Sequence, residues 1–134
     1  MTPEQVENLM TGINIKWQKI IARMWAVQDE TNKYPQIVLS IEKSEKKDAR
    51  LLKFLVFICD VPVDVKPDFF KEFLKLNFIV EHGTFAMETL TEMSFMDTLE
   101  MKGLDPEEFS ATLDAMRKAP RMFRERYDID KYTF

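Results

Sequence analysis

Three proline-led segments indicate where this chain begins its helices. They are TPEQ at residues 2–5, KPDF at 66–69 and DPEE at 105–108. Each segment puts proline at the first helical position, where a missing N–H costs nothing, and follows it with an acidic residue that suits the positive end of the helix dipole. Thr2 with Gln5 also matches a capping box, and the third segment repeats that spacing. The sequence therefore predicts three helices.

The residues after the first proline predict one helix from about residue 3 to 21. The alternative ends this helix at Gly12 and makes 14–28 a strand, but the Lys, Gln, Ala, Arg and Met residues there favour helix. Apolar residues recur at three- and four-residue steps, as on one face of a helix: Val6, Leu9, Met10, Ile13, Trp17, Ile20, Ile21 and Met24.

Strands are predicted between the first and second helices. Residues 22–28 and 36–42 read as two strands around a polar turn, and 51–61 is an almost continuously apolar strand that ends at Pro62. The charged run KSEKKD at 43–48 mixes both signs, which indicates a solvated turn rather than a basic docking patch.

The second helix is predicted from Pro67 to about Phe78 and is followed by a hairpin, GTFAME at 83–88 and MSFMDTLEMKG at 93–103. The third helix has an apolar stripe that includes Phe109, Leu113 and Met116. Pro120 is expected to kink or restart it, so that 120–134 forms a further short helix or a docked tail.

The predicted order is α-β-β-β-α-β-β-α. This order indicates an α+β fold with a mostly antiparallel five-stranded sheet covered by helices. With 134 residues, we expect one domain over 1–134, in which 1–28 holds the N-terminal helix and first strand.

Composition and charge exclude several classes of function. A hydrophobic content of 46% excludes disorder, no apolar run approaches the ~20 residues of a membrane span, and a net charge of −4 disfavours nucleic acid and anionic lipid as partners. The first ten residues lack the pattern of a secretory signal, and the single Cys59 suits a reducing compartment. We therefore expect a cytoplasmic protein.

The chain shows no catalytic or metal-binding constellation. Its single histidine, His82, stands directly before Gly83, where a helix is expected to hand over to a strand, and it has no second histidine or nearby thiol to act with. Alternation puts Asp97 on the face of Phe95 and leaves open whether it bonds across the sheet or faces a dimer seam. No phosphate loop or dinucleotide fingerprint occurs, so we predict no enzyme, no cofactor and no metal.

Large apolar side chains are unusually frequent. Eleven Phe, nine Met and two Trp stand against three Gly, and many lie in the first two predicted helices. A sheet of about five strands offers limited area to cover two broad apolar helices, which predicts that part of this surface meets another chain.

Two long segments of the chain resemble a known fold. DVPVDVKPDFFKEFLKLNFIVEHGTFAME and LEMKGLDPEEFSATLDAM resemble the type III secretion chaperone-like fold and, within it, the YbjN-like group of bacterial putative sensory transduction regulators. The likeness covers about 36–128. The matching features are Val61-Pro62, the helix ending in Leu74, Leu76, Asn77 and Phe78, the strand opening at Gly83 with Phe85, and the helix start Leu104 to Glu108.

The resemblance implies a homodimer that binds a protein client. In chaperones of this fold, an unstructured segment of the client is held extended on apolar patches and sheet edges, without ATP. The counterpart of the dimer helix is 67–77, which assigns Phe69, Phe70 and Phe73 to the dimer interface. The first helix and early strands would form the partner-binding groove, with Met10, Trp17, Met24 and Trp25 as its residues.

Three functions follow as hypotheses. The first is a non-enzymatic, dimeric, chaperone-like module that holds an extended client segment. The second is a YbjN-like regulatory adaptor that binds a folded signalling partner. The third is a small-molecule enzyme with a cleft between the first helix and the sheet.

Overall fold

The structure, a computed structural model, describes residues 2–28, 31, 33–46 and 48–126. Its element order is α-β-β-β-β-α-β-β-α, which confirms the α+β class but adds a sixth strand to the predicted five. The bounds are α1 Pro3–Gly12, β1 Trp17–Ile21, β2 Met24–Val27, β3 Ile37–Lys43, β4 Arg50–Asp60, α2 Pro67–Ile79, β5 Thr84–Ala86, β6 Glu92–Glu100 and α3 Pro106–Arg126.

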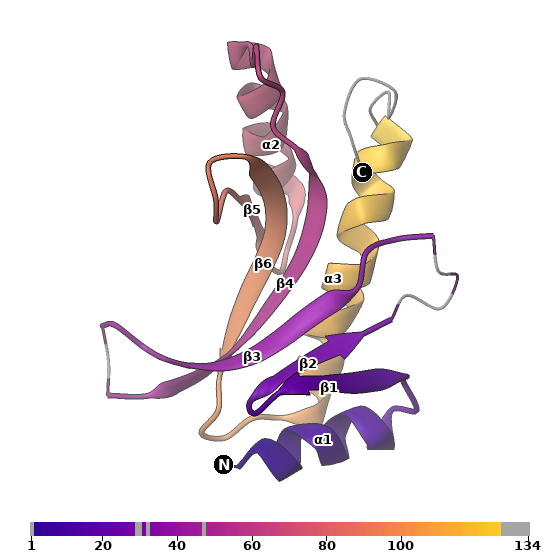
Figure 1. Ribbon diagram of the computed structural model, residues 1–134, viewed down its shortest axis with the longest axis vertical. Helices are drawn as coiled ribbons and strands as arrows, with labels where there is room; N and C mark the ends of the chain where they lie inside the picture. Colours follow the sequence, from indigo (N-terminus) through magenta and orange to yellow (C-terminus); the bar gives the residue numbers. More distant parts are fainter. Residues whose placement is uncertain (1, 29–30, 32, 47, 127–134) are drawn as a thin grey trace.

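The six strands form one antiparallel sheet in the order β1-β2-β3-β4-β6-β5 (Figure 1). The long apolar strand β4 lies inside it, as its sequence predicted, with Phe54 opposite Leu39 of β3 and Val56 opposite Phe95 of β6. A register shift between Phe57 and Cys59 allows two successive residues, Ile58 and Cys59, to be buried. The edges of the sheet are β1 and the three-residue β5.

The additional strand corrects the reading of the N-terminal segment. The predicted helix over 3–21 is wrong beyond Gly12, because the chain turns at Asn14, whose φ of 57° is left-handed, and then forms the β1–β2 hairpin. The two-residue turn of that hairpin ends at Arg23, with φ 66°. Residues 13–21 include four Ile and one Trp, which suit a pleated surface, and pairing with β2 outweighs the modest helix propensity of the residues between them.

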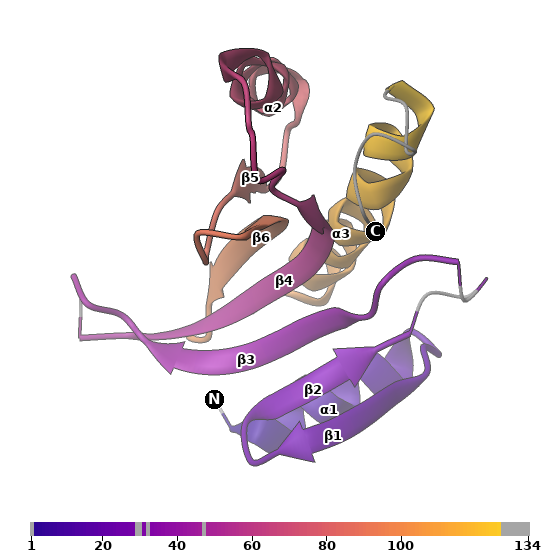
Figure 2. The ribbon, with the colours of Figure 1, turned by 45° about the horizontal axis from the view of Figure 1, so that its top comes forward.

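The helices cover one face of the sheet. Figure 1 draws α1 below β1 and β2, and Figure 2 shows it behind these two strands. The helix α3 packs on β4 and β6, while α2 projects beyond the end of β4. Alternate residues of β4 from Leu52 to Ile58 enter the single core that these helices complete. The intervening side chains, among them Leu55 and Phe57, lie half-buried on the opposite face.

The third helix passes through Pro120 without a break and continues to Arg126. The expected kink or restart does not divide it. Ala119, Pro120 and Phe123 are all buried, so packing against the core holds the helix where the proline removes a backbone hydrogen bond. The tail predicted beyond this point, 127–134, lies outside the described residues.

The His82-Gly83 pair forms the corner where α2 gives way to β5. Gly83 has φ 79°, and a Cβ there would lie 2.5 Å from the Cε2 atom of Phe95. Asn77 fastens the corner: Phe85 N donates to its Oδ1 at 2.6 Å, and its Nδ2 donates to the Phe85 carbonyl at 3.1 Å. The interpretation of this pair as a helix-to-strand junction is confirmed.

Candidate partner-binding surfaces

The second helix buries two of the three phenylalanines assigned to a dimer interface. Phe73 is only 4% exposed, and its ring contacts Phe85 and stacks on Phe123 at centroid distances of 5.3 Å. Phe69 is also buried and meets Phe73 edge-on at 5.1 Å. Phe70 alone is half-buried. The argument that one copy cannot enclose these rings is therefore wrong for Phe69 and Phe73.

The opposite side of α2 presents a different apolar row. Phe70, Leu74 and Phe78 follow one another at four-residue steps, and Leu74 and Phe78 are 67% and 92% exposed. We call these three residues the outer α2 stripe. Lys71 and Lys75 are exposed beside it, the latter 3.7 Å from Glu72. Such an apolar row with a polar border is typical of a contact surface.

The N-terminal residues assigned to a partner groove are also divided by burial. Met10 and Trp25 are fully buried, and the Trp25 Nε1 atom donates to Glu7 of α1 at 3.0 Å. Placing Trp25 at the edge of a groove is therefore wrong: it lies in the core and ties α1 to β2. Trp17 and Met24 are half-buried and partly accessible.

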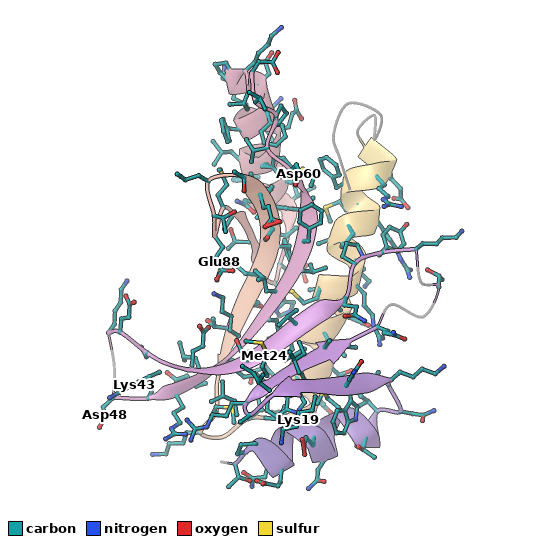
Figure 3. The ribbon with its side chains drawn as sticks, viewed as in Figure 1. Lys19, Met24, Lys43, Asp48, Asp60 and Glu88 are labelled. Atoms are coloured by element: carbon teal, nitrogen blue, oxygen red, sulfur yellow. The ribbon has the colours of Figure 1, made fainter. Side chains whose placement is uncertain are left out.

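Strand β1, which begins at Trp17, forms an accessible edge of the sheet, and Met24 begins the neighbouring strand β2. Ile20 and Ile21 at its end are 50% and 61% exposed, and Figure 3 labels Lys19 and Met24 in this region. Gln28 N donates to the Lys16 carbonyl at 3.3 Å, and Trp17 stands opposite Val27. Since hydrogen-bonded and non-hydrogen-bonded pairs alternate, the backbone groups of Trp17 and Lys19 point away from β2 toward the outside.

A groove of about 330 Å³ lies between the end of α2 and the middle of α3. We call it the α2–α3 groove. Ile79, Val80 and His82 line one side, and Ala115, Ala119 and Met122 line the other. The small side chains of α3 leave the space open. Alanines at four-residue steps on an amphipathic helix are the sequence feature that could have indicated this groove, and the sequence reading did not use it.

Catalytic features are sparse in the described part of the chain. Among those residues, no group of three or more His, Cys, Asp or Glu is placed to hold a metal ion. Burial, with a smaller effect from Asp60, raises the pKa of the Cys59 thiol to about 12, so it is a poor nucleophile. The Asp97 Oδ1 atom accepts a hydrogen bond from the backbone N–H of the next residue, Thr98, at 2.8 Å. This bond lies within β6 and does not cross the sheet.

No helix in the described ranges has the length and hydropathy required to cross a bilayer.

Comparison with known proteins identifies the family. The family model CesT_Tir_1 matches residues 2–125, almost the whole described chain. The chain therefore belongs to the CesT_Tir_1 family of type III secretion chaperones, which bind partner proteins. A search of curated proteins gave no match.

Proposed function

We propose that this member of the CesT_Tir_1 family is a non-enzymatic, homodimeric chaperone that acts in the cytoplasm and holds an extended segment of a client protein. Family membership supports the binding of a partner protein. The absence of a candidate metal cluster among the described residues and the unreactive Cys59 give no support to catalysis.

The observation that carries the proposal is the open β1 edge. Strand β1 has outward backbone groups at Trp17 and Lys19 and two large exposed aliphatic side chains, Ile20 and Ile21. An unpaired edge of this kind accepts an additional strand, whose backbone bonds give affinity and whose alternate side chains give specificity. A client segment with alternating apolar residues fits this edge.

The four predicted partner-binding residues take different parts in this proposal. Trp17 and Met24 lie where a client side chain can reach them. Met10 and Trp25 do not contact the client in this proposal. They support the edge from the core, because both are buried and the hydrogen bond from Trp25 to Glu7 holds α1 against β1 and β2. Ile20 and Ile21 join the surface as contacts that the helix reading of 3–21 concealed.

The dimer in this proposal forms through the outer α2 stripe. Leu74 and Phe78 present apolar surface that the chain itself does not cover. Burying a large apolar side chain is worth about 1.5–3 kcal/mol, so three from each copy can offset a substantial part of the cost of association. Phe69 and Phe73 support the stripe from the inner side of the same helix.

The test begins by identifying the client at the edge. A photo-crosslinking amino acid at Ile21 should capture the client in native cells, whereas the same group at Leu90, exposed at the opposite end of the sheet, should not. A captured disordered segment supports a chaperone. Capture of a folded receptor or kinase would instead favour the regulatory adaptor.

The captured segment then tests strand addition. Lys19→Pro removes an outward N–H without removing a bond to β2, and Lys19→Ala is the matched control that keeps the N–H. We expect Lys19→Pro to weaken binding about tenfold, since an unmade backbone hydrogen bond costs about 1–3 kcal/mol. Lys19→Ala should bind almost normally. Equal binding by the wild type and the proline variant would contradict strand addition at this edge.

A further inference from the structure

We propose that Phe78 of each protomer inserts into the α2–α3 groove of its partner, so that each copy supplies both a projecting ring and a receiving pocket. This inference rests on the homodimer proposed above. It goes beyond that dimer because it names what the outer α2 stripe contacts in the second copy.

The projecting side chain is the most exposed aromatic ring on α2. Phe78 is 92% exposed, and Leu74 lies one turn before it on the same side. The Phe78 ring thus stands outside its own core, while the neighbouring Phe73 fills that core. A ring in this position is a typical anchor for a pocket on another chain.

The groove has the size and lining to receive a phenyl ring. Its volume is about 330 Å³, and an apolar cavity of about 150 Å³ is sufficient for benzene. Phe95, which is buried, contributes to the lining, and Ala115 and Met122 line the α3 side. On the α3 side the lining includes alanine at 111, 115 and 119, and these short side chains leave room for the ring to enter between the helices.

A twofold contact requires ring and pocket to lie side by side on the same surface. In such a contact, residue i of one copy meets residue j of the other while j meets i. Ile79 supplies this adjacency, because it follows Phe78 in the chain and lines the groove. A twofold axis near the end of α2 would therefore exchange the two Phe78 rings between the two grooves.

The charges beside the two surfaces favour the same arrangement. Lys71 and Lys75 are exposed next to the outer α2 stripe. The ionisable groups that line the groove are Glu81, Asp114, Lys118 and His82, which carry a net charge of −1 when the histidine is neutral. Lys71, and Lys75 with its partner Glu72 on the same helix, thus meet a slightly negative border on the receiving surface, and the positive charge of Lys71 complements it.

Sedimentation equilibrium of the full chain tests the inference from both sides. Phe78→Ala removes the ring, and Ala115→Leu fills the groove without changing α2. Each should raise the dimer dissociation constant by about tenfold to a hundredfold. The double variant should lose little more than either single variant, because both remove the same contact. Ala111→Trp at an exposed position of the lining is a second filling variant if Ala115→Leu folds poorly.

Matched controls are available for both changes. Leu90→Ala removes an equally exposed apolar side chain from another element, and Glu108→Trp adds a bulky side chain elsewhere on α3. Neither should alter dimerisation. Mixed protomers give a direct readout: chains with Phe78→Cys and chains with Ala115→Cys should be joined to each other by a short bis-maleimide.

The outcomes separate this inference from the proposed dimer. A wild-type chain that remains monomeric overturns both. A wild-type dimer that is weakened by Phe78→Ala but unaffected by either filling variant keeps the dimer and overturns the groove as its receiver. Filling variants that impair only client binding would show that the client occupies the groove, which also overturns the inference.

Discussion

Replacing Phe73 and Phe78 in turn by alanine tests how the structure divides the two faces of α2. The two residues have the same side chain, lie five positions apart on one helix and differ in exposure, 4% against 92%. Phe73→Ala should destabilise the protomer strongly. Phe78→Ala should leave the stability of the protomer almost unchanged.

The expected magnitude follows from what Phe73 touches. A buried phenylalanine removes about 200 Å² from water, which at about 25 cal/mol/Å² corresponds to about 5 kcal/mol, and Phe→Ala changes in cores cost about 3–5 kcal/mol. Stacking on Phe123 adds about 0.5–1.5 kcal/mol to that loss. Since domains of this size are stable by about 5–15 kcal/mol, the variant should be marginal. Phe78→Ala should change the free energy of unfolding of the protomer by no more than about 0.5 kcal/mol.

Urea unfolding measures the difference, provided that the protein is dilute enough to be monomeric. Dimerisation would otherwise stabilise the wild type by mass action and make Phe78→Ala appear destabilising. The slope of the free energy of unfolding against urea concentration should be the same for the wild type and both variants if each variant changes only stability. A loss below about 1 kcal/mol for Phe73→Ala would refute the core assignment and return Phe73 to the dimer interface that the sequence indicated.

Two further predictions concern the corner after α2 and the thiol of β4. Gly83→Ala should lower the free energy of unfolding by about 1–3 kcal/mol, because the backbone there has φ 79° and a Cβ would collide with the Phe95 ring. Gly103→Ala is the matched control, since Gly103 has φ 74° but open space around it, and it should lower the free energy of unfolding by only about 1 kcal/mol. Thermal unfolding of both variants measures the difference. Burial raises the pKa of Cys59 from an ordinary 9.0 to about 12. Between these two values the unfolded chain loses the thiol proton while the folded chain keeps it, so the free energy of unfolding should fall as the pH rises from 9 toward 12 and should be unaffected by this group below pH 9. Iodoacetamide at pH 8 should therefore label Cys59 only after unfolding, and labelling of the native chain at the unfolded rate would contradict its burial.

The local chemistry of the sequence was sufficient to predict most of the elements. The proline starts gave α1, α2 and α3 at Pro3, Pro67 and Pro106, and the apolar run over 51–61 gave β4 within one residue. Gly83 marked its corner because a left-handed residue close to an aromatic ring permits no Cβ. In each case, a backbone requirement or a covered strand leaves its mark within a few adjacent residues.

Residues 13–21 could not be predicted in the same way. Their apolar spacing fits a helix face as well as a twisted strand with a register shift, and the shift between Lys19 and Ile21 breaks the alternation that would identify a strand. The deciding contribution comes from β2, with which this segment forms its ladder. Partner strands of this kind are not visible in the propensities of the segment itself.

The candidate site shows a related limit. Counting aromatic residues predicted correctly that α2 is apolar on more than one side, but a count does not say which side the sheet covers. That is decided by where β5 and α3 meet the helix: Phe73 faces both, through Phe85 and Phe123, so the residues on the far side are the ones left open. The inner rings pack α2 against β5 and α3, which leaves Leu74 and Phe78 on the outer side of the helix. Leu74 and Phe78 are left uncovered because β5 and α3 meet only the inner face of α2. A partner that binds the outer face therefore meets a helix whose inner face is already packed, and this lowers the entropic cost of association.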